Sequence, residues 1–456
     1  MTAVEKVKRV LFVVVSIWAI ASVLYQGYAV NRSWFSDPHV EQTAREFAVD
    51  DVDDAVFLKD IGHHHSIGGP LFWWHNGWHG TAYPYYWRPM TMFGFWTEYQ
   101  LFGAYRFDRW QIADSFFHLL FAAVLWLFAY RVTGSRFAGP LAVVVMTGFQ
   151  LFDVPMLDFA DVFTTPGADV VLGNWKDQPE QWAAICTLAS LLSVMGLRPG
   201  KDEREKLPAS AWWSAIGFAA ASVCFKESGW LTFPMLLVAL VYVGRLRQIP
   251  KWAWFAMIAV WAVLIALRAS SGHHVMFPPP DPSNHNGLSR YLKHVLDPDI
   301  QQATTDSWPV IVFAAFTGLL ILARRPRFLP KFGILLAAAA LTSVLLGVSH
   351  HSDPAAGMAL LVDPRGGLVL FVTALVEALI LIVAYRFRPV RSQAVFLYLL
   401  ILLSDLPDIA VRQPNEHMQY FTNGLQSVMV IAIALACARQ VAVDIVDRRR
   451  KRLAAV

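Results

Sequence analysis

Acidic side chains crowd the first polar segment of this sequence. Asp50, Asp51, Asp53 and Asp54 stand almost side by side, and Asp60 follows soon after. Carboxylates this close together oppose one another's ionisation unless they are splayed into water or meet a cation. They are either a solvated helix end or a source of a general base, which would take a proton from an acceptor hydroxyl at a membrane surface.

Histidine is the second residue type whose distribution suggests chemistry. The run of His63, His64 and His65 follows the acidic cluster, and imidazole with carboxylate is a common ligand set for divalent metals. The spacing matches neither a zinc finger nor a His-Glu-x-x-His helix. The run is therefore a candidate metal site, with exposed or interface histidines as the alternative.

Twelve apolar runs are candidates for membrane-spanning helices. The chain is 56% hydrophobic and 16% charged, against about 25% charged in ordinary soluble domains. A span needs about 20 apolar residues to cross about 30 Å of hydrocarbon, and most of the runs approach that length. The predicted spans are residues 9–30, 108–131, 136–155, 180–197, 209–225, 229–245, 252–270, 308–323, 331–350, 367–385, 393–411 and 421–441. We therefore expect an all-α polytopic membrane protein with about 12 transmembrane helices, whose residues 1–456 form a single transmembrane domain.

The charges between these spans differ strongly from side to side. The short connections on one side hold 25 Lys/Arg and 6 Asp/Glu, whereas the segments on the other side hold 13 Lys/Arg and 27 Asp/Glu. Basic loops stay on the cytoplasmic side. The sequence therefore predicts an integral plasma (inner) membrane protein with both termini cytoplasmic and its long loops external or periplasmic. Because the basic excess lies in these turns, it indicates contact with membrane lipids and no nucleic-acid partner.

Residues 31–107 form a long first outer loop in this topology. Within it, residues 38–48 have the spacing of an amphipathic helix that Asp37 could cap. The aromatic residues between Phe72 and Tyr99 could rest on lipid headgroups or form a stacking surface for a sugar or prenyl chain.

A polar break interrupts the apolar stretch 209–245. Lys226, Glu227, Ser228 and Gly229 stand in its middle, so we expect two short spans and not one long broken helix. A broken helix at membrane depth usually marks a site, because its freed backbone and charged side chains need partners.

Five short motifs, in a fixed order, resemble the GT-C superfamily of polytopic glycosyltransferases. The similarity is closest to the O-mannosyltransferase-like branch, whose members often carry tetratricopeptide repeats, although this sequence shows none. It implies a GT-C-like fold that moves a sugar from a polyprenyl-phosphate carrier to a protein or lipid acceptor on the outer face. The motifs are Tyr86-Trp87-Arg88-Pro89-Met90-Thr91, Glu98-Tyr99-Gln100-Leu101-Phe102-Gly103, Tyr130-Arg131-Val132-Thr133-Gly134-Ser135-Arg136, Phe225-Lys226-Glu227-Ser228-Gly229 and Glu416-His417-Met418-Gln419-Tyr420-Phe421.

The resemblance also implies roles for individual residues. The family's acidic pair falls on Asp53 and Asp54, one of which would be the catalytic base. Arg88, Lys226 and Arg412 would lie near the phosphate of the lipid-linked donor, whose tail stays in the bilayer while its anionic head meets cations at the surface.

Both leading cations have a structural alternative. Arg88 could form an ion pair with a loop carboxylate. Lys226 could pair with its neighbour Glu227, or extend its ammonium group to the membrane surface.

Three function classes stay open from the sequence. The first is the glycosyltransferase, for which the lipid-phosphate sugar is a substrate, no cofactor is certain and a divalent metal is a candidate. The second is a non-catalytic GT-C-like subunit of a larger membrane complex, with partner subunits docked on the outer loops. The third is a secondary transporter, for which Glu377 within a predicted span is the supporting residue.

Overall fold

The computed structural model describes residues 3–50, 52–76, 87–147, 178–196, 206–271, 388–410 and 420–453, and every regular element in them is helical. The helices of the first half are α1 (Ala3–Ser36), α2 (Val40–Asp50), α3 (Val52–His63), α4 (Gly69–Asn76), α5 (Pro89–Phe102), α6 (Phe107–Thr133) and α7 (Ala138–Met146). Those that follow are α9 (Gln178–Met195), α10 (Ala209–Phe225), η3 (Glu227–Leu231), α11 (Thr232–Tyr242), η4 (Leu246–Gln248), α12 (Lys251–Ser270), α19 (Arg388–Ala410) and α20 (Tyr420–Leu453).

Four of these helices are long and apolar enough to cross a membrane. They are Val4–Ser36 in α1, Phe107–Thr133, Lys251–Ser270 and Tyr420–Asp447 in α20. Shorter apolar helices cover Ala209–Phe225, Glu227–Tyr242 and Val390–Ser404. The coarse prediction of a helical protein with apolar helices long enough to span a membrane is thus confirmed. The predicted spans 308–323, 331–350 and 367–385, and the second half of 136–155, lie outside the described residues.

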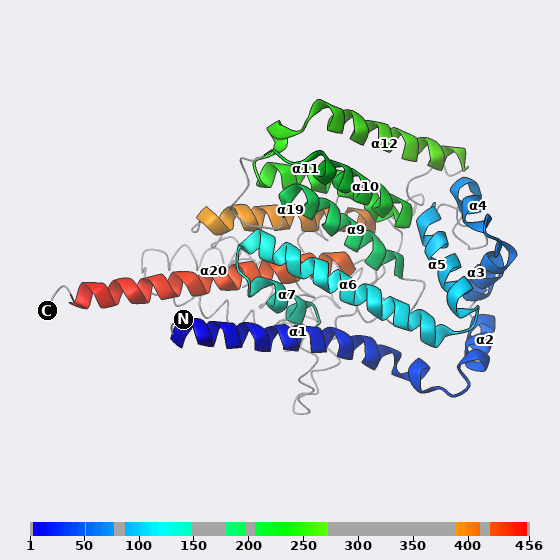
Figure 1. Cartoon of the computed structure of the whole chain (residues 1–456), viewed down its shortest axis with the longest axis horizontal. Coiled ribbons are helices and arrows are strands. Elements are labelled where there is room, and N and C mark those ends of the chain that lie inside the picture. Colours follow the sequence, from blue (N-terminus) through cyan, green and yellow to red (C-terminus); the bar gives the residue numbers. More distant parts are fainter. Residues whose placement is uncertain are drawn as a thin grey trace, which may run out of the picture.

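The long helices run side by side, and the two ends of the bundle differ (Figure 1). Both chain termini lie at one end, which we call the terminal end. At the opposite end lie the four short helices α2 to α5, which we call the end layer. The predicted first outer loop is therefore largely a set of packed helices in its described part.

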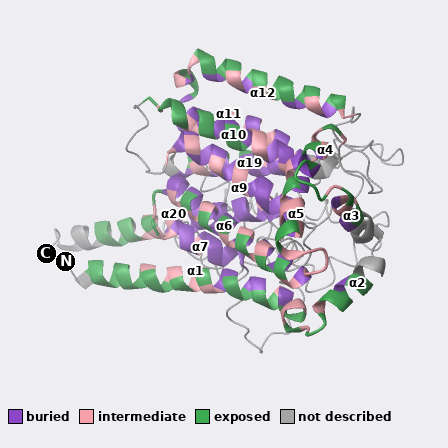
Figure 2. Cartoon of the chain, turned by 45° about the vertical axis from the view of Figure 1, so that its right-hand side comes forward, coloured by how far each residue is buried: buried purple, intermediate pink, exposed green. Residues whose placement is uncertain are grey.

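The centre of the bundle is α9, which contacts α6, α10 and α11. Almost all of α7 and α9 is buried, whereas α1 and α12 expose much of their surface (Figure 2). Apolar side chains on that surface, such as Ile17 and Phe255, are 62% and 72% exposed. A helix that is apolar on all sides suits the core of a bundle, and an exposed apolar face suits contact with lipid.

The end layer has an aromatic core of its own. Trp73, Phe95 and Trp110 are fully buried there, and Ala44 on α2 packs into the same cluster. Trp87 is also fully buried and packs edge to face on Trp74. These rings are neither a lipid-facing belt nor a stacking surface, because their faces are covered by other side chains.

The helix predicted over residues 38–48 is present as α2 and begins at Val40. The backbone N–H of His39 donates to Asp37 at 2.7 Å. The Thr43 hydroxyl and this backbone N–H bind the carboxylate of Asp37 and hold its pKa below the usual range. Asp37 therefore holds the turn that leads into α2 and the Thr43 side chain of its first turns, whereas the first-turn N–H groups of Gln42 and Thr43 bind the carbonyl of His39.

The polar break in residues 209–245 separates two helices. Helix α10 ends at Phe225, Lys226 is extended, and η3 leads into α11. A side chain at position 229 would overlap the backbone of Ser222 and Val223, so only glycine allows the chain to fold back this tightly on α10. The prediction of two helices is confirmed.

Candidate functional site

The break is the meeting point of buried charges from several helices. The guanidinium of Arg88, at the start of α5, donates Nε to Glu227 Oε2 at 2.7 Å, and its second nitrogen lies 2.7 Å from the same oxygen. The backbone N–H of Trp87 donates to Glu227 Oε1 at 3.2 Å. Residues 139 positions apart in the chain thus join the end layer to the break.

Lys226 has a different partner from the one expected. Its ammonium forms an ion pair with Glu180, in the first turn of α9, and both side chains are buried. The alternative that Lys226 pairs with Glu227 is therefore wrong, because the extended backbone at Lys226 directs the two neighbouring side chains to different partners. The alternative that Arg88 forms an ion pair is confirmed, but its partner Glu227 belongs to η3 at the break and is not the expected loop carboxylate.

Arg268 completes this group of charges. It lies at the end of α12, is 4% exposed, and its guanidinium lies 4.0 Å from Glu227 Oε1. Glu227 therefore stands between two guanidinium groups. We call the five side chains the ion-pair network: Arg88, Glu180, Lys226, Glu227 and Arg268.

Further hydrogen bonds tie the end layer to the break. The hydroxyl of Thr91 donates to the carbonyl of Phe225 at 2.5 Å. That carbonyl belongs to the last turn of α10, where helix carbonyls have no intrahelical partner. The start of α5 therefore holds both sides of the break, with Thr91 on the end of α10 and Arg88 on η3.

A second polar group surrounds the first turn of α9. The side-chain amide of Gln181 donates to Asp114 on α6 at 2.8 Å, and that of Gln178 donates to Glu98 on α5 at 3.4 Å. Burial raises the pKa of Glu98 to about 8, which outweighs the lowering by the amide of Gln178. Glu98 therefore keeps its proton at neutral pH.

A small cavity of about 20 Å³ adjoins Glu180. Thr187, Ser228 and Ser404 are among the residues that line it. A single water needs about 10–15 Å³ and two to four polar partners. The cavity fits one water beside the ion-pair network and is too small for a sugar.

The other predicted site residues are placed less completely. Asp53 and Asp54 fall in the first turn of α3, in the end layer, but their side chains lie outside the described part. Arg412 and Glu377 also lie outside the described residues. Among the predicted site residues, the structure brings together Arg88 and the Lys226 break.

The histidine run does not converge on a point. The ring of His64 stacks on Phe72 at 3.8 Å and lies 3.8 Å from the Asp60 carboxylate. His65 contacts the carbonyl of Gly62 at 2.7 Å, and His63 is exposed at the end of α3. Within the described residues, no three His, Cys, Asp or Glu side chains are grouped as a metal site requires.

Four charged residues of this region were not predicted as site residues: Glu98, Asp114, Glu180 and Arg268. The sequence contains a signal that could have identified them. A charge within or beside an apolar span is costly and usually has a functional or structural partner. What the sequence could not give is the pairing, since each partner lies on another helix.

The chemistry of the ion-pair network would allow an anionic ligand to replace a carboxylate on one of its cations. Three cationic side chains from α5, the Lys226 break and α12 meet two carboxylates, and a phosphate offers the same bidentate geometry to a guanidinium as a carboxylate does. Comparisons of the chain with protein-family models, characterised proteins and solved structures give no match.

Proposed function

We propose that this protein is a membrane glycosyltransferase of the GT-C type, which moves a sugar from a polyprenyl-phosphate carrier to an acceptor on the outer face. The observation that carries the proposal is the convergence of Arg88, Lys226 and Arg268 under the end layer. Cations in a dry, fixed arrangement stabilise the negative charge that grows on a departing phosphate.

The proposal includes a topology of about twelve spans with cytoplasmic termini. Support comes from the alternating direction of the described helices and from the position of both termini at one end (Figure 1). In this arrangement the end layer lies on the outer side, where the head of a lipid-linked donor would be presented.

In the proposed reaction, the acceptor oxygen forms a bond to the sugar's anomeric carbon while the bond from that carbon to the phosphate oxygen breaks. Asp53 or Asp54 takes the acceptor's proton, and the phosphate leaves with the electron pair. A guanidinium has five N–H donors, so Arg88 can hold Glu227 and a phosphate oxygen together. Lys226 and Arg412 complete the phosphate site.

The test uses the purified full-length chain in detergent with radiolabelled polyprenyl-phosphate-mannose. We expect release of label from the lipid, and a loss of about 10²–10⁴ in rate in the Asp53→Asn, Asp54→Asn double variant. Donor binding should be nearly unchanged in that variant. Arg88→Gln should weaken donor binding as well as turnover.

Two control variants match these charge changes. Glu41→Gln with Glu46→Gln removes two exposed carboxylates of α2, and Arg109→Gln removes an exposed cation beside the end layer. Both should keep the parental rate. An unchanged rate in the double aspartate variant would refute the assigned base.

The second candidate is a non-catalytic subunit with the same fold. It is favoured by the fact that Arg88 and Lys226 both form buried ion pairs, which is what a purely structural contact would look like. If the intact protein neither binds nor turns over the donor, and co-purifies from native membranes with a subunit covering the end layer, this second function replaces the first.

A further inference from the structure

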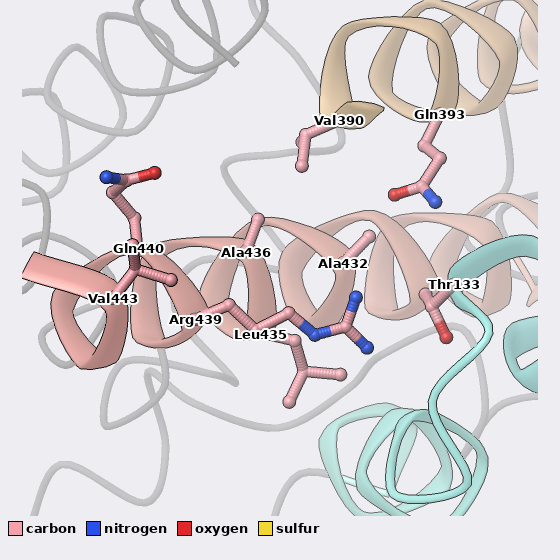
Figure 3. Close-up of a pocket in the computed structure, with 9 residues that line it drawn as sticks. All are labelled: Thr133, Val390, Gln393, Ala432, Leu435, Ala436, Arg439, Gln440 and Val443. Carbon is pink, nitrogen blue, oxygen red and sulfur yellow. The ribbon is translucent and has the colours of Figure 1, made fainter. Parts of the chain in front are cut away.

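A cleft of about 210 Å³ lies between α6, α19 and α20 (Figure 3). None of the residues that line it belongs to the ion-pair network. Its walls are mainly apolar: Val390 on α19, and Leu435 and Val443 on α20. Ala432 and Ala436 share one face of α20 because they are four residues apart, and their small side chains leave room between the two helices.

Arg439 stands over this apolar cleft. It is exposed, and within the described part of the chain it has no ion pair. Figure 3 shows its guanidinium pointing along α20 toward Thr133, at the end of α6. The side chain of Gln393 points into the space between α19 and α20 from the other side.

The nearby helix end does not require this arginine. The last carbonyls of a helix need donors, and a basic side chain often supplies them. Here the carbonyl of Val132 accepts from Gln393 Nε2 at 2.9 Å and from the Tyr242 hydroxyl at 3.2 Å. The carbonyl of Tyr130 accepts from the backbone N–H of Gly134 at 2.9 Å. Arg439 is therefore available to a ligand in the cleft.

The size and lining of the cleft select the ligand. Sites for whole small molecules usually enclose about 300–1,000 Å³, and this one is smaller. It suits a segment of hydrocarbon chain, with an anionic group beside Arg439. Basic residues at the ends of spans, next to gaps between helices, are typical contacts of anionic lipid headgroups.

We propose that this cleft binds one acyl chain of an anionic glycerophospholipid, whose phosphate lies against Arg439. The site is separate from the ion-pair network, and the proposal does not depend on the glycosyltransferase function. It requires only that α19 and α20 meet lipid at the terminal end of the bundle.

Native mass spectrometry of the full chain, with phosphatidylglycerol or phosphatidylcholine added to the detergent, tests this proposal. We expect the wild-type protein to retain phosphatidylglycerol in preference to phosphatidylcholine. Arg439→Gln should lower phosphatidylglycerol retention about fivefold, the effect of one cation near an anionic headgroup. Ala436→Phe keeps the arginine and fills the cleft, and it should lower retention of both lipids.

The matched control is Arg247→Gln. Arg247 is exposed in η4 between α11 and α12, and it does not line the cleft. It should leave lipid retention unchanged. The proposal is overturned if Arg247→Gln reduces lipid retention as much as Arg439→Gln, or if the wild type does not prefer the anionic lipid. It is also overturned if inorganic phosphate displaces phosphatidylglycerol, because that would indicate a site for free phosphate.

Discussion

At the terminal end of the bundle, buried arginines bind backbone carbonyls, whereas under the end layer the buried cations bind carboxylates. Arg131 donates Nε to the carbonyl of Met195 at 2.8 Å, and Arg245 donates to that of Val194 at 2.7 Å. Both carbonyls belong to the last turn of α9. At the other end of the same helix, Glu180 binds Lys226.

The two kinds of partner have different consequences. Carbonyls at a helix C-terminus carry a fixed partial negative charge, which suits an arginine and does not change with pH. A carboxylate can change protonation, and another anion can take its place on the cation. The contacts at the terminal end are therefore insensitive to pH and to ligands. The contacts beside the end layer can be altered by a ligand or a proton.

Breaking the Arg88–Glu227 pair should have the largest effect on stability. Glu227→Gln removes the carboxylate that stands between Arg88 and Arg268, and both guanidinium groups stay buried. Removal of one partner from a buried ion pair costs about 3–5 kcal/mol. Equilibrium unfolding of the purified protein in detergent measures this change.

A matched double variant separates the charge from the packing. Arg88→Met with Glu227→Leu removes the pair and keeps its volume, and such a replacement is often neutral or stabilising. We expect the double variant to recover most of the loss in free energy of unfolding. If the double variant is as unstable as Glu227→Gln, the pair is needed for packing, and the exchangeable arrangement we describe is wrong.

Removal of a buried arginine at the terminal end should lower the free energy of unfolding by a smaller amount. Arg131→Met removes a charged hydrogen bond to the carbonyl of Met195, and such bonds contribute about 1.5–3 kcal/mol. Its methionine side chain keeps much of the packing of the arginine stem. The same unfolding measurement should show a smaller loss than in Glu227→Gln. A loss larger than in Glu227→Gln would reverse the comparison of the two ends.

Much of the helical framework could be predicted from the sequence, because apolar runs and polar interruptions are local signals. The break at Lys226 and the amphipathic helix α2 are confirmed for this reason. Arg245 stands at the end of the predicted span 229–245, and the structure shows that it is 2% exposed and bound to α9. Charge counts indicate the end of a span and say nothing of whether a neighbouring helix covers the charge.

The pairing of the site residues could not be predicted. Arg88 and Glu227 are 139 residues apart, and the choice among many carboxylates depends on how α5, α9 and α10 pack. The sequence offered Glu227 as one alternative partner of Lys226, whereas the extended backbone gives each residue its own partner on another helix. Asp53 and Asp54 stay a prediction, since no described contact tests their role.

Glu98 offers the finest test of the comparison, because it is a buried titratable group of the end layer itself. Its folded-state pKa is about 8, and the ordinary value is 4.5. Between these values the unfolded chain releases a proton that the folded protein keeps, so rising pH favours unfolding. Glu98→Gln should remove this term. The free energy of unfolding of Glu98→Gln should exceed that of the wild type by an amount that is absent below about pH 4.5. This difference should grow by at most about 1.4 kcal/mol per pH unit up to about pH 8.

Thermal unfolding in detergent at pH 5.5, 7 and 8.5 measures this difference between Glu98→Gln and the wild type. Glu46→Gln is the control, because Glu46 is an exposed glutamate of α2 in the same end layer. The variant Arg131→Met should differ from the wild type by the same amount at all three pH values, since its partner is a carbonyl that does not titrate. A pH-independent effect of Glu98→Gln would mean that Glu98 does not titrate in this range. Any pH dependence of stability on the end-layer side of the bundle would then have to come from the ion-pair network alone.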